Sequence, residues 1–351
     1  MKKIFKFLIV VLLLVVIGLG GLVAFLAITK YKPEAETTLF RSRKNNTHIN
    51  DSTEFSALIW NIGYAGLDKD MDFFFDGGKQ VRPLKENSIR NFDAIIRFIA
   101  SQDDSDFILL QEVDQKAKRS YGRNQVEELA TLFPDRNTQF GMNYNVRFVP
   151  VPPRSPMGKV KSGLVTVSKV EPFSVTRFSF PGKFNFPMNL AMLDRCFVAN
   201  RYLLKNGKEL VIVNTHNSAY DDGSLRRNEM TFFKTFLDTE YHKGNYILVG
   251  GDWNQCPPNF IPLYTDNKFD NTSRIDIEPD YLPSDWTWAY DASIPTNRRV
   301  STPYAMDESL TTVIDFFLLS PNVELIEVKG IPNEFLYSDH NPVRVKFKIR
   351  S

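Results

Sequence analysis

The stretch Ile247-Leu-Val-Gly-Gly-Asp-Trp-Asn254 places two glycines and two polar side chains directly after a short apolar run. The run, residues 246–249, has the length and composition of a buried strand. In open α/β sheets ligands bind at the carboxyl ends of strands, and glycine there lets the chain turn sharply or a ligand approach the backbone. Asp252 and Asn254 are therefore candidate site residues, although an Asp and an Asn at such a position also form Asx turns.

Apolar runs with similar endings recur along the chain and alternate with amphipathic segments. Asn206-Gly207 between two of these runs predicts a β-hairpin. Strands that alternate with helices predict one α/β domain, and the sequence contains no internal repeat. The predicted strands are 55–62, 106–112, 162–168, 195–204, 209–216, 246–249, 313–320 and 343–349, the predicted helices are 86–100, 126–133 and 225–237, and residues 143–156 and most of 256–310 are predicted to be loops.

Composition and charge limit the class of protein. Hydrophobic residues make up 43 % of the 351 residues and aromatic residues 13 %, which is enough for a sizeable core. The net charge of +2 is uneven, because residues 1–52 hold eight Lys/Arg and three Asp/Glu, which leaves −3 for the remainder. The remainder thus lacks the basic excess typical of nucleic-acid-binding domains. Cys196 and Cys256 allow one disulfide at most, and the absence of a CxxC pair argues against a structural zinc site.

The N-terminus predicts membrane attachment. Lys2, Lys3 and Lys6 precede an uncharged apolar run at residues 7–28, and a helix of this length spans roughly 30 Å, the thickness of a bilayer core. A cleavable signal is the alternative, although its apolar core is usually shorter. The basic residues before the run predict a cytoplasmic N-terminus and an extracytoplasmic remainder. The predicted division is an anchor or uncleaved signal at 1–29, a polar tether at 30–52 and the α/β domain at 53–351.

Polar residues suited to metal and phosphate chemistry lie near the ends of the predicted strands. Asp315 lies inside an apolar strand, where a buried carboxylate needs a partner such as histidine. Carboxylates and amides without cysteine suit a hard cation such as Mg²⁺ or Mn²⁺. Added histidines suit attack of water on a phosphoester, in which charge on the non-bridging oxygens must be stabilised. The residues are Asn61, Glu112, His216, Asp252, Asn254, Asp315, Asp339 and His340.

Six short motifs in this order resemble those of the endonuclease/exonuclease/phosphatase superfamily, which includes pancreatic-type deoxyribonucleases, neutral sphingomyelinases and inositol-polyphosphate 5-phosphatases. The resemblance covers residues 55–350 and implies a four-layer sandwich of two mixed β-sheets flanked by helices, with one pocket at an edge of the sheets. The motifs are Trp60-Asn61, Leu110-Gln-Glu112-Val, Asn214-Thr-His216, Gly251-Asp-Trp-Asn254, Ile314-Asp315-Phe-Phe-Leu-Leu-Ser and Ser338-Asp-His340.

The resemblance also implies roles for the carboxylates and amides. Glu112 would be the principal metal ligand, supported by Asn61 and Asp339. Asp252 would orient or deprotonate the attacking water, and Asn254 would hold the phosphate.

The histidines and two arginines complete the implied site. His340, with its tautomer fixed by Asp315, would stabilise charge that develops on the phosphate. His216 would polarise the phosphate or protonate the leaving group. Arg226 and Arg299 are candidate phosphate contacts, although exposed arginines are usually only solvated.

The sequence therefore predicts a membrane-anchored, metal-dependent phosphodiesterase that acts on nucleic acid or on a phospholipid headgroup. A phosphomonoesterase of the same family is one alternative. A non-catalytic binding protein on the same fold is another, but Glu112, Asp252 and His340, whose loss would mark it, are all present. The sequence does not predict the oligomeric state.

Overall fold

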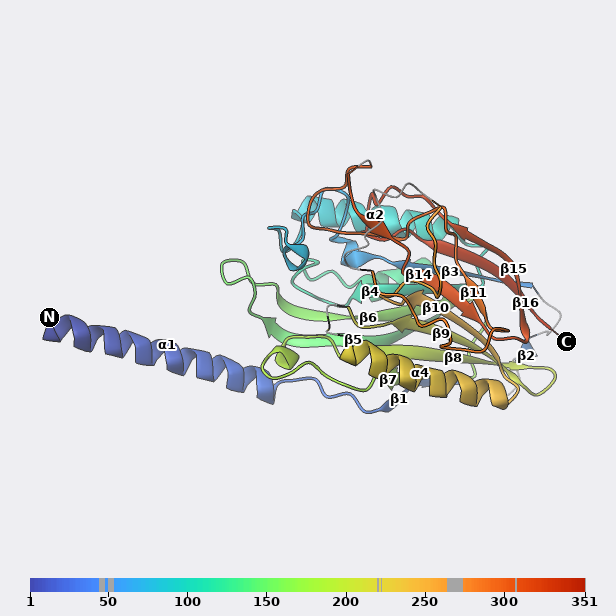
Figure 1. The fold of residues 1–351 in the computed structure, drawn as a ribbon, viewed down its shortest axis with the longest axis horizontal. Coiled ribbons are helices and arrows are strands. Elements are labelled where there is room, and N and C mark those ends of the chain that lie inside the picture. Colours follow the sequence, from blue (N-terminus) through green and yellow to red (C-terminus); the bar gives the residue numbers. More distant parts are fainter. Residues whose placement is uncertain are drawn as a thin grey trace.

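The computed structural model describes residues 1–43, 48–49, 54–219, 221, 223–263, 274–306 and 308–350. Within these ranges the chain forms two large mixed β-sheets that lie face to face, with helices on the outer faces (Figure 1). Strands with apolar side chains on both faces must be covered on both sides, which this layering achieves. The predicted four-layer α/β sandwich is confirmed.

The larger sheet contains the strand that ends at Asp252. In spatial order the described strands are β1 (Glu36–Arg41), β7 (Ser174–Ser179), β8 (Cys196–Leu204), β9 (Glu209–His216), β10 (Tyr246–Asp252), β14 (Asp315–Leu319) and β11 (Thr287–Ala289), with β2 (His48–Ile49) beside β8. β9 and β10 are parallel and place His216 opposite Asp252, whereas β14 is antiparallel to β10 and places Asp315 opposite Asp252. The register thus brings three predicted site residues to one edge.

The smaller sheet brings two more predicted site residues to the same edge. Its described strands are β15 (Val323–Gly330), β16 (Val343–Ile349), β3 (Glu54–Asn61), β4 (Phe107–Asp114), β6 (Gly158–Ser168) and β5 (Asn137–Val149) in spatial order. β3 and β4 are parallel, so Asn61 and Glu112 lie near neighbouring strand ends. A short pair, β12 (Asn297–Arg298) and β13 (Thr311–Thr312), lies outside both sheets.

Three cores hold the layers together. Side chains alternate along β3, so Phe55, Ala57 and Ile59 pack between the sheets while Leu58 and Trp60 pack outward. The outward side chains meet helices α2 (Lys85–Ser101) and α3 (Gln125–Leu132). Helix α4 (Ser224–His242) packs its aromatic face on the outside of the larger sheet. The edge that carries the site residues is thereby fixed by rigid elements.

The strands that the sequence prediction missed are mostly at or near sheet edges. β1, β5, β7 and β15 are all absent from the predicted strands, and β1 and β15 show only partial burial along their length. An edge strand has one unpaired side and often a solvated face, so it needs no continuous apolar run. Two expectations change: residues 36–41 of the expected tether join the larger sheet, and β5 occupies part of the expected loop at 143–156.

Helix α1 (Lys2–Ile28) extends away from the sandwich (Figure 1). In the described part of the chain it alone is long and apolar enough to cross a membrane. Its side chains are exposed as far as residue 21. Cys196 and Cys256 are both buried free thiols rather than a disulfide.

Candidate functional site

A cavity of about 540 Å³ opens at the sheet edge where β3, β4, β9 and β10 end. Nine of the ten residues predicted to form the site line it, and the tenth, Asp315, lies behind His340. The structure therefore brings the whole predicted set together. The nine lining residues are Asn61, Glu112, His216, Arg226, Asp252, Asn254, Arg299, Asp339 and His340.

Asp252 is the centre of the polar contacts in this cavity. Asn61 Nδ2 donates a hydrogen bond to Asp252 Oδ2 at 2.9 Å, and the backbone N–H of Asn254 donates to Oδ1 at 2.9 Å. The Nε2 atoms of His216 and His340 lie 3.4 Å and 3.8 Å from Asp252 Oδ2. The carboxylate is thus held by donors from both sheets and faces two imidazoles.

The local backbone explains why glycine and asparagine flank Asp252. Gly251 has φ 150°, and a Cβ there would lie 2.1 Å from the backbone oxygen of Thr215. Asn254 has φ 51°, a left-handed conformation that Asn adopts more readily than most residues. Its Nδ2 donates to the backbone oxygen of Asn217 at 2.9 Å. The contact from the Asn254 N–H to Asp252 has the form of an Asx turn, so the turn and the site coexist.

His340 and Asp315 form a buried hydrogen-bonded pair. His340 Nδ1 lies 2.7 Å from Asp315 Oδ2, and Nε2 lies 3.0 Å from Asn297 Nδ2. Burial alone would lower the pKa of His340, but the carboxylates of Asp315, Asp339 and Asp252 outweigh burial and raise it. The pair therefore holds a proton on Nδ1 and leaves Nε2 directed at the cavity.

His216 has the opposite electrostatic environment. Burial, followed by the charges of Arg195 and His340, lowers its pKa well below the ordinary value. Its Nδ1 has no hydrogen-bond partner within the described ranges. A neutral imidazole beside Asp252 is the consequence at pH 7.

Glu112 is turned into the cavity by an irregularity in β4. The pairing of β4 with β6 shifts between Leu110 and Val113, and Glu112 has φ 55°. Such a bulge re-aims a side chain, and positive φ in a residue other than glycine carries strain that is typical of functional sites. The carboxylate of Glu112 lies 3.6 Å from Arg119 Nη2.

Asp339 and Glu112 make the cavity suitable for a hard cation. Burial, together with the charge of Glu112, raises the pKa of Asp339 to about 7 even though His340 and Arg298 oppose the rise. Two carboxylates that repel each other are stabilised by a cation between them. With the amide oxygen of Asn61, the donors are all oxygen, as Mg²⁺ and Mn²⁺ prefer.

A second group has spacing that could hold a metal ion, namely Asp252, Asp315 and His340. Its members are already engaged, because His340 Nδ1 is hydrogen-bonded to Asp315 and Asp252 accepts bonds from Asn61 and Asn254. This group is therefore already hydrogen-bonded, whereas the Glu112 side of the cavity offers further oxygen donors.

The two arginines predicted as phosphate contacts both line the cavity. Arg226 is largely buried, and its Nε lies 2.5 Å from Asp221 Oδ1. Arg299 follows β12, and its backbone N–H donates to Leu310. Both are cations at the rim, and Arg226 is already paired with a carboxylate.

Two site residues were missed by sequence reasoning, Arg119 and Asn297. Arg119 is buried, lies 3.7 Å above the ring of Tyr64 and pairs with Asp114 at 2.9 Å. Asn297 lies against His340. Both come from loops or very short strands that carry no local apolar pattern. A buried Arg five residues beyond a strand has no sequence signal, whereas Asn297 begins the stretch Asn297-Arg-Arg299 that contains the predicted Arg299.

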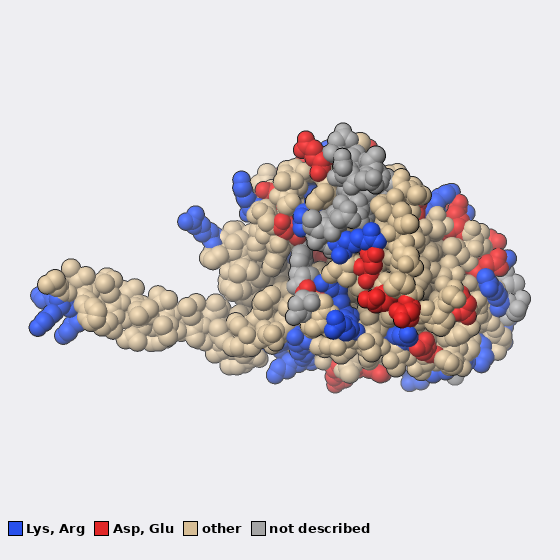
Figure 2. All heavy atoms as spheres, viewed as in Figure 1, with Lys and Arg blue, Asp and Glu red and all other residues tan. Residues whose placement is uncertain are grey.

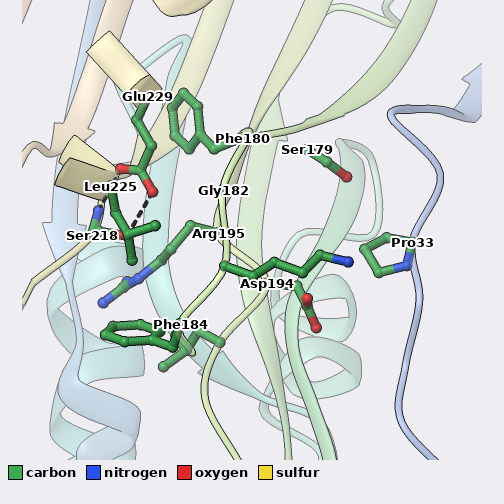
Figure 3. A pocket seen from close by; sticks show the side chains of 12 residues that line it. Pro33, Ser179, Phe180, Gly182, Phe184, Asp194, Arg195, Ser218, Leu225 and Glu229 are labelled. Carbon is green, nitrogen blue, oxygen red and sulfur yellow. Dashed lines mark hydrogen bonds between the residues drawn. The ribbon is translucent and has the colours of Figure 1, made fainter. Parts of the chain in front are cut away.

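A smaller cavity of about 50 Å³ lies beside the main one and shares part of its wall. Figure 3 shows Glu229 of α4 on one side and Pro33 of the segment after α1 on the other, with Arg195 below Glu229. Ser218 Oγ donates to Glu229 at 2.6 Å, and burial raises the pKa of Glu229 to about 7. Phe184, Leu193 and Arg195 line both cavities, so one loop links the N-terminal segment to the main site.

One family model matches most of the chain. A model described as the endonuclease/exonuclease/phosphatase family matches residues 58–340. No curated protein sequence matches the chain.

Solved structures of low sequence identity share the fold. An endonuclease/exonuclease/phosphatase from Beutenbergia cavernae is 16 % identical, with a TM-score of 0.55, over 84 % of this chain and 72 % of that chain. ANGEL2, described as a 2′,3′-cyclic phosphatase, is 17 % identical, with a TM-score of 0.54, over 86 % and 97 %. TDP2 from D. rerio, solved with a single-strand DNA product, is 13 % identical, with a TM-score of 0.52, over 84 % and 99 %.

Proposed function

The chain belongs to the endonuclease/exonuclease/phosphatase family, whose hydrolase fold it has, and from this premise we propose that it is a membrane-anchored phosphodiesterase dependent on Mg²⁺ or Mn²⁺. The observation that carries the proposal is the contact of Asp252 with Asn61, His216 and His340 in one cavity. A binding protein would have no need to gather a base, a neutral imidazole and a charged imidazole around one point.

The metal ion would be held by Glu112 with support from Asn61 and Asp339. When bound, it supplies Lewis-acid stabilisation of the charge on the phosphate oxygens. Glu112 has a strained backbone and Asp339 has a raised pKa. Both features support this assignment, because a bound cation would offset the strain energy of Glu112 and stabilise the ionised carboxylate of Asp339.

The residues of the chain would handle the protons and orient the substrate. Asp252 accepts a proton from the attacking water, since its carboxylate is fixed by Asn61 and by the turn at Asn254. Asp315 holds the Nδ1 proton of His340, and Nε2, which lies 3.0 Å from Asn297 Nδ2, would donate to a phosphate oxygen when protonated and turned to the substrate in place of the Asn297 amide.

His216, two arginines and Asn254, whose side chain would hold the phosphate, complete the proposed machinery. The neutral ring of His216 polarises the phosphate or passes a proton to the leaving group. Arg226 and Arg299 at the rim attract the phosphodiester.

Membrane attachment is part of the proposal and rests on α1. Its apolar length and the lysines at its start favour an uncleaved single-pass anchor with the cytoplasm on the N-terminal side. A cleaved signal is the alternative, and the mass of the mature protein decides between them.

The test is hydrolysis of bis(4-nitrophenyl) phosphate by the full-length protein in detergent, with Mg²⁺ or with a chelator. We expect turnover only with metal, and His340→Ala should lower kcat by about 10²–10³ because one transition-state contact is lost. His242→Ala is the matched control, because His242 is an exposed histidine at the end of α4.

The same assay separates the other functions. Turnover of 4-nitrophenyl phosphate but not of the diester would replace the proposal with a phosphomonoesterase. A folded protein without turnover of either ester would favour a binding protein.

A further inference from the structure

We propose that the catalytic cavity faces the bilayer that holds α1, and that the substrate is the phosphodiester of a phospholipid in that bilayer. This inference rests on the proposed function and names its substrate class. It requires that the domain be held close to the membrane, that lipid-compatible side chains surround the root of α1, and that the same side chains lead into the cavity.

The first requirement is met by a short and fixed connection. Only residues 29–35 separate α1 from β1. The last turn of α1 packs on the domain through Leu26, which is 6 % exposed, against β5 and the short helix η3 (Met188–Leu190). Lys30 Nζ donates to the backbone oxygen of Asn189 at 2.7 Å. A connection of this kind holds the domain at the membrane surface, unlike a long flexible tether.

The second requirement is met by the loop that contains η3. Residues 180–193 contain Lys183 as their single charged residue. Phe186 and Met188 are 66 % and 55 % exposed although both are large and apolar. Figure 2 shows that the surface around the root of α1 consists largely of uncharged atoms. Exposed apolar side chains beside a membrane helix are stabilised when they enter the acyl boundary of the bilayer.

The loop between β5 and β6 adds a basic and apolar neighbour. Residues 137–168 contain no Asp or Glu, and their four basic residues include Arg147, Arg154 and Lys159. The tip of this loop lies at the same end of the molecule as α1 (Figure 1), and Val151 at the tip is 39 % exposed. Lys and Arg at this position attract lipid phosphates while the apolar side chains enter the bilayer.

The third requirement is met because both loops also form cavity wall. Phe184 and Met192 from the η3 loop and Met157 from the β5–β6 loop line the catalytic cavity. The same cavity carries the polar residues around Asp252. Apolar side chains from both proposed membrane-facing loops and the polar residues around Asp252 thus line one cavity, which matches a phosphodiester that carries an apolar tail.

The depth of the two loops in a bilayer tests the orientation. Nitroxide labels are placed on Phe186→Cys and Val151→Cys in the full-length chain, reconstituted in phosphatidylcholine–phosphatidylglycerol vesicles. Ile326→Cys is the matched control, because Ile326 is 41 % exposed on β15, at the end opposite α1 (Figure 1). The native cysteines Cys196 and Cys256 are buried. The chain without an added cysteine therefore serves as the background control for labelling.

We expect dissolved oxygen to broaden the electron paramagnetic resonance spectra of the labels at 186 and 151 more than an aqueous nickel complex does. At 326 we expect the nickel complex to broaden the spectrum more than oxygen does. Labels at 186 and 151 that are as accessible to nickel as the label at 326 would overturn the inference. This measurement is independent of activity, so an inactive protein would refute the proposed function without touching the orientation.

The substrate is tested by headgroup release from vesicles of phosphatidylcholine and sphingomyelin. The double variant Phe186→Ser with Met188→Ser should lower release by about tenfold or more, because two apolar side chains no longer enter the bilayer. Its turnover of soluble bis(4-nitrophenyl) phosphate should equal that of Ile326→Ser. Equal losses on both substrates, or cleavage of plasmid DNA without headgroup release, would refute the lipid assignment.

Discussion

Two groups of charged side chains, one partly buried and one buried, lie at opposite ends of α4 and the larger sheet and differ in how their charges are balanced. In the Arg201 cluster, defined as Arg201, Glu209, Glu240 and Lys243, Arg201 Nη1 lies 2.7 Å from Glu209 and 2.8 Å from Glu240. In the catalytic cluster, defined as Asp252, Asp315, Asp339, Glu112 and the histidines 216 and 340, carboxylates outnumber their cationic partners.

The difference appears in the ionisation of the acids. Burial alone would raise the pKa of Glu240, but hydrogen bonds from Arg201, Lys243 and Asn245 lower it to about 2. Burial and the charge of Glu112 raise the pKa of Asp339 to about 7. The Arg201 cluster therefore stabilises the fold, whereas the catalytic cluster costs stability in order to assemble reactive groups.

The largest expected effect is the loss of activity in Asp252→Asn. The amide keeps the shape of the carboxylate but cannot accept a proton, so kcat should fall by about 10²–10⁴. The melting temperature should fall by only about 4 °C, because the Asn254 N–H still finds an acceptor although the hydrogen bond from Asn61 Nδ2 is lost. Steady-state hydrolysis and differential scanning calorimetry measure the two quantities. Retained activity would remove Asp252 from the role of base.

The matched change in the other cluster is Glu240→Gln, which should destabilise without affecting catalysis. Loss of the charge leaves the guanidinium of Arg201 partly uncompensated, so the free energy of unfolding should fall by about 2–3 kcal/mol. Urea unfolding of the detergent-solubilised protein measures the loss, and kcat should stay within about twofold because Glu240 is far from the reacting groups. A variant with wild-type stability would contradict the assigned role of the Arg201 cluster.

The central strands and the site residues on them could be predicted from the sequence because both depend on local pattern. β3, β4, β9, β10 and β14 are buried on both faces and read as continuous apolar runs. The polar residues that end these runs had to meet once the strands were aligned.

The edge strands and the loop residues could not be predicted in this way. β1 pairs with β7 through its backbone while much of its surface remains solvated, so its pattern resembles a linker. Arg119 and Asn297 reach the site only because distant segments pack together. The packing of distant segments, and no local sequence signal, determines where β1 pairs and where Arg119 and Asn297 lie.

A smaller effect is expected from metal binding. Mg²⁺ at ten times its dissociation constant should raise the free energy of unfolding by about 1.4 kcal/mol, because it binds the folded state. Glu112→Gln should abolish this rise, whereas Glu240→Gln should retain it in full. Thermal melts with and without a chelator measure the rise. An equal rise in Glu112→Gln would place the metal elsewhere, with the Asp252–Asp315–His340 group as the next site to test.

The last prediction concerns the pH dependence of the Arg201 cluster. Glu240 has a folded pKa of about 2, below the ordinary value of 4.5, so its contribution is complete above pH 4.5 and is lost as the pH falls toward 2. The Gln side chain does not titrate. The stability difference between wild type and Glu240→Gln should therefore be constant from pH 7 to 5 and shrink progressively below pH 4.5, as measured by urea unfolding at pH 6, 4 and 3. A difference that stays constant down to pH 3 would show that shape and hydrogen bonding at residue 240, and not its charge, stabilise this end of the molecule.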